Sequence, residues 1–168
     1  MRRPASGNWQ IVLALALLLA APGAFGVECP LNNNPLCSAA TNLGAISGDS
    51  GSQAISRAGV GEAFFLVQLK ETSAFSRALT ARVVLNVPPG ADYDLIVRCF
   101  SCASTAMRTS NAASGVAELV NVSRPDTFGD QSFVIAIEIR YRSGSSCAQW
   151  ALAVTGNTGA SAAPLACQ

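Results

Sequence analysis

The stretch from Gly90 to Thr105 contains the side chains best placed, by type and spacing, to do chemistry. Asp92 and Asp94 are two residues apart, so on a strand both project to the same face. Such a pair ligates calcium when other oxygen atoms join it, or forms a solvated face that Arg98 and other arginines neutralise. We take the pair as candidate calcium ligands, with three carboxylates as possible additions: Glu118, Asp126 and Asp130.

The same stretch ends in a C-x-x-C motif formed by Cys99 and Cys102. A zinc site would require two further thiolates or histidines at comparable spacing. A redox-active motif of this kind sits at the N-terminus of a helix, which lowers the thiol pKa. Here the motif follows a strand-like run in an all-β pattern. We therefore predict a structural disulfide between Cys99 and Cys102 that pins the end of the strand.

The chain has no histidine, which removes the commonest general base and a common metal ligand. The segment GDSGS (48–52) resembles the surroundings of a serine-protease nucleophile, but that triad needs an imidazole. An aspartic-protease site needs two aspartates that share a proton, and Asp49 alone supplies one. We interpret the segment as a loop and Lys70, the only lysine, as a solvated charge. The sequence thus predicts a protein without enzymatic activity.

Alternation of apolar and polar residues shows which elements must position these groups. Apolar residues recur at every second position in five runs, which is typical of strands with one buried face. Turn residues separate the runs, and none of the intervening segments has a helical stripe. A shorter run, 116–122, alternates less clearly. The pattern predicts an all-β, antiparallel β-sandwich, jelly-roll-like, with its main strands within 61–71, 78–87, 92–99, 132–142 and 148–154.

The N-terminus has the features of a secretory signal peptide, predicted over residues 1–26. Arg2 and Arg3 precede an uncharged apolar run, and small residues precede the expected cleavage after Gly26. We expect a Gly-, Ser- and Ala-rich N-terminal arm with possible edge strands at 27–60, the β-sandwich domain at 61–156 and a tail at 157–168. Without the two arginines, nine basic groups face ten acidic ones. This balance gives no electrostatic reason to expect nucleic acid or anionic membrane as a partner.

All six cysteines follow the predicted cleavage site, and an even number in an exported chain indicates disulfides. Pairing of neighbours in sequence is the simplest arrangement, which would add Cys29–Cys37 and Cys147–Cys167 to the Cys99–Cys102 bridge. A bridge between the two termini is the alternative for these outer cysteines. Either arrangement predicts a disulfide-stabilised domain.

The order of motifs resembles the bacterial pre-peptidase C-terminal domain. The resemblance covers residues 61–155. It rests on the run GEAFF (61–65), the core strand ADYDLIVR (91–98) after a Pro-Gly turn, a long apolar strand (133–139) and a closing strand from Trp150 to Val154. It implies a secreted, jelly-roll-like accessory module. Some members of that family bind collagen or polysaccharide, and some bind calcium. We expect the accessory module alone, without a peptidase domain.

Together these features predict a secreted, extracellular or periplasmic, non-enzymatic β-sandwich that acts as an accessory or binding module. We expect its partner to be an extracellular protein or polysaccharide, with calcium as a possible cofactor at Asp92 and Asp94. Two alternatives are a carboxylate-dependent hydrolase that uses Asp49, Asp92 or Asp94, and a structural envelope or matrix protein.

Overall fold

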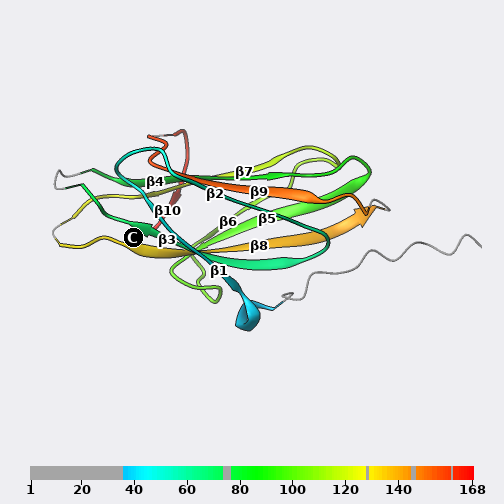
Figure 1. Ribbon diagram of the computed structural model, residues 1–168, viewed down its shortest axis with the longest axis horizontal. Coiled ribbons are helices and arrows are strands. Elements are labelled where there is room, and N and C mark those ends of the chain that lie inside the picture. The colour runs from blue at the N-terminus through cyan, green and yellow to red at the C-terminus, as the bar shows by residue number, and fades with distance from the viewer. Residues whose placement is uncertain (1–35, 74–76, 128, 145–146, 160) are drawn as a thin grey trace, which may run out of the picture.

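The computed structural model describes residues 36–73, 77–127, 129–144, 147–159 and 161–168. Over these residues the chain forms two five-stranded sheets that pack face to face (Figure 1). Sheet A has the strand order β1-β3-β8-β5-β6 and sheet B the order β10-β7-β4-β9-β2. The strands of sheet A are β1 (Thr41–Ser47), β3 (Ala63–Lys70), β5 (Ala91–Cys99), β6 (Met107–Ser110) and β8 (Phe133–Gly144). Those of sheet B are β2 (Ala54–Gly59), β4 (Leu79–Asn86), β7 (Glu118–Arg124), β9 (Trp150–Gly156) and β10 (Leu165–Ala166).

The predicted fold class is confirmed, and the sandwich follows the alternation in the sequence. Along β3, for example, Ala63, Phe65, Val67 and Leu69 are buried, while Gln68 and Lys70 are exposed. The inward-facing side chains of both sheets form one apolar core. One detail differs from a purely antiparallel sandwich: β1 pairs with β3, and β10 with β7, in parallel. Both parallel pairs lie at a sheet edge, and they involve the first and the last strand of the described residues.

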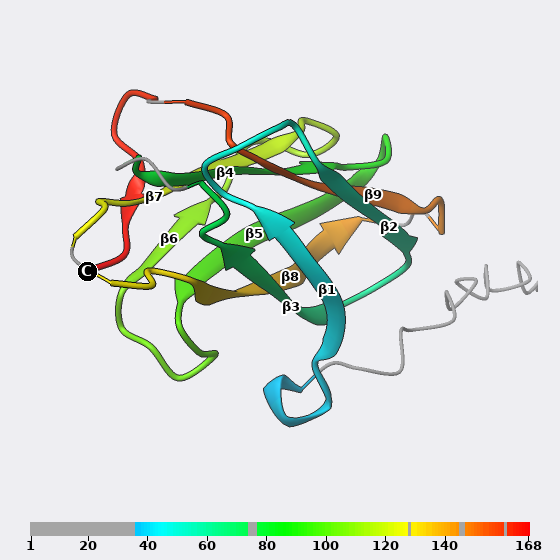
Figure 2. The ribbon, with the colours of Figure 1, turned by 60° about the vertical axis from the view of Figure 1, so that its left-hand side comes forward.

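The Gly-, Ser- and Ala-rich arm and the tail both contribute strands. The possible edge strand in the arm is confirmed as β2, which pairs with β9 over its whole length. A second strand of the arm, β1, follows the short 3-10 helix η1 (Cys37–Ala39). Figure 2 shows β1 running beside β3 at the edge of sheet A. The residues described include no helix long and apolar enough to cross a membrane. The predicted signal peptide lies outside the described residues.

The predicted pairing of neighbouring cysteines is wrong. Cys37 is bonded to Cys102 and Cys99 to Cys167, at sequence separations of 65 and 68. Cys147 is also disulfide-bonded, and Cys29 lies outside the described residues.

The backbone between Cys99 and Cys102 explains why they do not pair. The side chain of Cys99 points into the core and is fully buried. The next residue, Phe100, has a φ of 69°, so the chain reverses there into the β5–β6 loop. Cys99 therefore meets the C-terminal tail inside the sandwich, while Cys102 meets the N-terminal arm outside it.

Candidate functional site

The outer face of sheet A carries the predicted Asp92 and Asp94 within a row of charged side chains on β5 and β8. The two strands are antiparallel neighbours, and their outward positions alternate with the core positions. We call this set the charged row: Asp92, Asp94, Arg98, Glu138, Arg140 and Arg142. Its three carboxylates and three guanidinium groups balance in formal charge.

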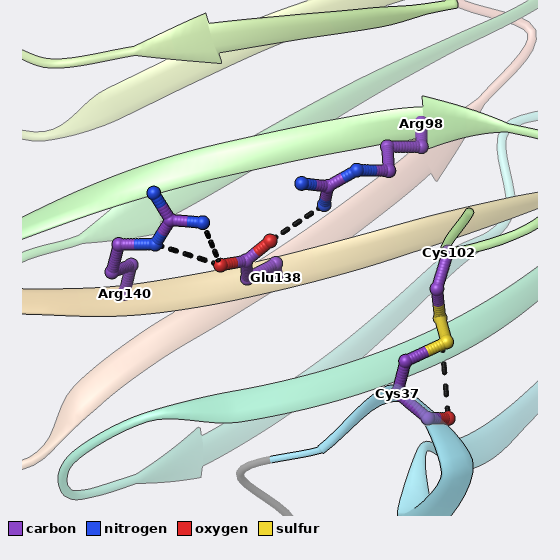
Figure 3. A network of polar contacts seen from close by, with 5 residues as sticks. All are labelled: Cys37, Arg98, Cys102, Glu138 and Arg140. Atoms are coloured by element: carbon purple, nitrogen blue, oxygen red, sulfur yellow. Dashed lines mark hydrogen bonds and ion pairs between the residues drawn. A yellow bond between two sulfur atoms is a disulfide. The ribbon is translucent and has the colours of Figure 1, made fainter. Parts of the chain in front are cut away.

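At the centre of the charged row, Glu138 lies between two arginines (Figure 3). Arg98 Nη1 donates to Glu138 Oε2 at 2.6 Å, and Arg140 Nε donates to Glu138 Oε1 at 2.8 Å. The Glu138 side chain is 8% exposed and that of Arg140 is 37% exposed. Glu138 lies opposite Ile96 in the strand register, so its ion pair with Arg98 runs diagonally between the strands. Ile96, on the same outer face, is 2% exposed.

A β-bulge places the third arginine of the charged row. Asp92 pairs with Ser143 and Tyr93 with Tyr141, which leaves Arg142 as the extra residue of β8. Arg142 Nε donates to Asp94 Oδ2 at 2.6 Å. This hydrogen bond, together with the nearby negative charges of Asp94 and Asp92, raises the pKa of Arg142 above its ordinary value. Asp94 is 4% exposed, so the guanidinium is the counter-charge of a buried carboxylate.

The candidate calcium pair offers too few free oxygen atoms for that ion. Oδ2 of Asp94 accepts the Arg142 hydrogen bond. In Asp92, Oδ1 is buried without a hydrogen-bond partner. Calcium takes six to eight oxygen ligands, and the described residues contain no group of three or more acidic, cysteine or histidine side chains able to hold a metal. A positive guanidinium also stands where the ion would have to bind. The donor set does not fit calcium.

The additional carboxylates considered as ligands lie elsewhere. Glu118 is completely buried on β7 in sheet B, where Oε1 accepts from the Ala112 N–H at 2.7 Å and Oε2 accepts from the Ser110 hydroxyl. It therefore ties β7 to the end of β6 in the other sheet. Asp130 accepts from the Ser132 N–H at 2.8 Å, and hydrogen bonds from Ser132 lower its pKa. Asp126 is half-buried in the β7–β8 connection. The spacing of these three carboxylates along the chain does not show where they lie in space. Their positions depend on the strand register and on the path of the β7–β8 connection.

Asp49, in the GDSGS segment, is a buried structural carboxylate. The segment is a loop between β1 and β2, as interpreted, but Asp49 is only 1% exposed, which the sequence did not indicate. Its two oxygens accept from the N–H groups of Thr72 and Ser73 at 3.1 and 2.9 Å and from the hydroxyls of Ser47 and Thr72. Burial opposes its ionisation, but these hydrogen bonds outweigh burial and lower the pKa of Asp49.

This network makes Asp49 a poor acid or nucleophile and a good anchor between the β1–β2 loop and the chain after β3. The hydroxyls of Ser50 and Thr72 lie 2.6 Å apart in the same cluster. An open hollow of about 410 Å³ lies beside the cluster, lined by Glu71, Thr72, Ser73 and Asp130. Lys70, at the end of β3, is exposed, as expected for a solvated charge.

Phe100 forms an exposed aromatic feature that the sequence did not indicate. Its ring is tilted against Phe133, with centroids 5.7 Å apart, and the Arg124 guanidinium carbon lies 5.3 Å from the Phe100 centroid. Phe100 is 41% exposed, and its backbone has a left-handed conformation. Periodicity could not reveal it, because Phe100 lies just beyond the end of β5.

Comparison of the sequence with protein-family models and with curated proteins gave no match. The arrangement of the side chains is therefore the basis for a functional proposal.

Proposed function

We propose that the chain is a secreted, non-enzymatic β-sandwich module that binds an extracellular protein or polysaccharide through the outer face of sheet A. The observation that carries this proposal is the charged row. Two of its carboxylates, Glu138 and Asp94, form ion pairs with arginines of the row, while the side chains of Arg140 and Arg142 remain 37% and 47% exposed. Two half-buried apolar side chains of β3, Phe64 and Leu66, lie beside the row, because they pair with Glu138 and Ala136 of β8.

Exposed arginines beside aromatic and aliphatic side chains are typical of binding surfaces. Arginine and aromatic residues are enriched in protein interfaces, whereas lysine, glutamate and aspartate are depleted. Arginine also offers several donors in a fixed plane, which suits the carboxylates and hydroxyls of extracellular polymers. The resemblance of residues 61–155 to the pre-peptidase C-terminal domain supports the same class of function.

Two further features support the extracellular location in this proposal. The described residues contain two disulfides and no free cysteine, and disulfides persist mainly in oxidising compartments. The N-terminal sequence supplies the predicted signal peptide over residues 1–26.

The hydrolase alternative finds less support in the arrangement of the carboxylates. A carboxylate acid–base pair needs two carboxyl groups at a set separation with contrasting environments. Asp49 accepts hydrogen bonds from four groups, and Asp94 is held by Arg142. The pKa of Asp49 is lowered, the opposite of what a general acid needs, and the arginine occupies the carboxylate of Asp94.

A pull-down with collagen and with insoluble polysaccharides, chitin and cellulose, tests the proposal. We expect Arg140→Ala and Arg142→Ala to weaken binding. The matched control is Arg82→Ala, because Arg82 is an exposed arginine on β4 with one side-chain partner, Asn121. Equal loss in all three variants, or binding to no polymer, would count against this face. Turnover of protein, glycan or ester substrates at enzyme-like rates would overturn the non-enzymatic assignment. Assembly of the protein into the cell envelope without a discrete ligand would favour the structural alternative.

A further inference from the structure

The two disulfides of the described residues differ sharply in their access to solvent. Cys99 and Cys167 are both fully buried and belong to the apolar core. Cys37 is exposed and Cys102 is half-buried. Cleavage of a disulfide begins with in-line attack of an external thiolate on one sulfur atom, so the rate depends on access to that atom. Of these two bridges, Cys37–Cys102 is therefore the one whose residues are accessible to solvent.

The exposed bridge also joins segments that lie outside the sandwich core. Cys37 begins η1, which rests against β3, and Cys102 lies in the β5–β6 loop. Figure 3 shows the bridge in the same view as Arg98, Glu138 and Arg140 of the charged row. Cys102 Sγ lies 4.0 Å from the carbonyl oxygen of Cys37. Both segments therefore meet over the outer face of sheet A.

Backbone hydrogen bonds hold the neighbouring strands without help from this bridge. The Phe100 N–H donates to the Val134 carbonyl at 2.7 Å, and the Cys99 N–H donates to the Ala106 carbonyl at 2.9 Å. The second bond closes the base of the β5–β6 loop, and the first joins the end of β5 to β8. On the other side of the bridge, the register of β1 against β3 holds the chain that follows η1. We therefore expect the strand pairs to persist when the bridge is opened.

We propose that Cys37–Cys102 is a thiol–disulfide exchange site for an external dithiol, whereas Cys99–Cys167 is a permanent structural bridge. A thiolate of the dithiol attacks Sγ of Cys37, forms a mixed disulfide and displaces Cys102 as a thiolate, which takes up a proton. The second thiolate of the dithiol then attacks the other sulfur of the dithiol, which is bonded to Cys37 in the mixed disulfide. Cys37 leaves as a thiolate and takes up a proton. The dithiol is oxidised to a cyclic disulfide, and the bridge gains two electrons and two protons.

Exchange at this site changes the surface rather than the fold. It frees η1 from the β5–β6 loop, while the buried bridge keeps the tail attached to the end of β5. The face of sheet A that carries the charged row then loses the cross-link beside it. The site thus places a redox-dependent tether next to that face, independently of what the face binds.

Stepwise reduction of the native protein tests this assignment. The oxidised protein is incubated with dithiothreitol at limiting concentrations, trapped with N-ethylmaleimide, digested and mapped by mass spectrometry. We expect Cys37 and Cys102 to be alkylated at least about tenfold faster than Cys99 and Cys167, with the β-sheet circular dichroism spectrum unchanged. Chymotrypsin is used for the digestion, because cleavage after Phe100 and Trp150 separates Cys99 from Cys102 and Cys147 from Cys167, so that Cys147 reports on its own bridge.

Two outcomes would overturn the assignment. One is labelling of Cys99 and Cys167 at the rate seen for Cys37 and Cys102. The other is labelling of Cys37 only after the sheet signal is lost. The double variant Cys37→Ser/Cys102→Ser is the control, and it should fold, lose the fast alkylation phase and keep the slow phase of the buried bridge. A fast phase that persists at Cys99 or Cys167 in this variant would also contradict the assignment.

Discussion

The side chains of Tyr93 and Trp150, which come from opposite sheets, form hydrogen bonds with the N–H and the carbonyl group of the same residue, Gly61. The Gly61 N–H donates to Tyr93 Oη at 3.1 Å, and Trp150 Nε1 donates to the Gly61 carbonyl oxygen at 2.9 Å. Both aromatic side chains are 1% exposed. Gly61 lies between β2 of sheet B and β3 of sheet A, and its φ of 75° is in the region that favours glycine. The pair thus fixes the point where the chain crosses between the sheets.

Removal of the Tyr93 hydroxyl should destabilise the fold. In Tyr93→Phe the buried N–H of Gly61 loses its acceptor, and an unsatisfied buried donor costs about 1–3 kcal/mol. Urea unfolding followed by tryptophan fluorescence measures this change in the free energy of unfolding. Tyr141→Phe is the matched control, because the Tyr141 hydroxyl donates to Gly144 at an exposed position. Its expected change is within about 0.5 kcal/mol, and equal losses in both variants would contradict the argument.

The same tyrosine predicts a loss of stability at alkaline pH. Burial raises the pKa of Tyr93, and the hydrogen bond from Gly61 offsets only part of this rise. Above the ordinary tyrosine pKa of about 10, the unfolded chain releases a proton that the folded chain retains. Stability therefore falls as the pH rises from the unfolded pKa towards the folded pKa. Melting temperatures measured between pH 8 and 11, in about half-unit steps, should fall more steeply for the wild type than for Tyr93→Phe. Parallel curves would show that Tyr93 does not contribute.

Asp49 gives the opposite dependence on pH. Its folded pKa is lowered, because the hydrogen bonds from Ser73, Thr72 and Ser47 outweigh the cost of burial. Its stabilising contribution is present above the unfolded pKa and is lost as the pH falls through the folded pKa. Asp49→Asn should cost about 1–3 kcal/mol at pH 7, and the difference from wild type should shrink below pH of about 4. Thermal unfolding across this range measures it. Asp130→Asn, at an exposed loop position, is the control and should cost less.

The sequence predicted the central strands because their buried faces leave a period of two. It predicted the shorter edges less well, for a physical reason. In β6 no residue from Met107 to Ser110 is buried, so no apolar alternation marks the strand. In β1, Gly44 and polar residues obscure the pattern, and only Ile46 and Ser47 are buried. These edge strands are held by backbone pairing with β5 and β3, which a pattern of side-chain types does not record.

The candidate site was predicted in part. The period of two placed Asp92 and Asp94 on one face, but their partner depends on the bulge at Arg142, which a pattern of residue types does not reveal. Disulfide connectivity failed for a similar reason. Cys99 and Cys102 are close in sequence, yet the reversal at Phe100 sends their side chains to opposite sides of sheet A. The direction in which each side chain points, rather than the spacing along the chain, decides both the ion-pair partner and the disulfide pairing.

Loss of the Glu138 charge should destabilise the outer face of sheet A. In Glu138→Gln the guanidinium of Arg98, whose side chain is 13% exposed, loses its counter-charge. Breaking a buried ion pair from one side costs about 3–5 kcal/mol, and we expect the lower end because Arg140 is partly exposed. Chemical denaturation measures the loss. Glu62→Gln, a half-buried glutamate before β3, is the control and should change stability little. A stable Glu138→Gln protein would show that the arginines are satisfied by solvent.

Calcium should leave the stability of the protein unchanged. Ligand binding to the folded state raises the melting temperature in proportion to the logarithm of ligand concentration. Asp94 is held by Arg142, and the described residues offer no acidic cluster for a metal, so differential scanning calorimetry in calcium chloride and in EDTA should give the same melting temperature. Arg142→Ala provides the sharper comparison, because it frees the carboxylate of Asp94 beside Asp92. A calcium-dependent rise seen only in this variant would show that the guanidinium occupies the place of the ion. A saturable rise in the wild type that Asp92→Asn abolishes would instead establish a calcium site.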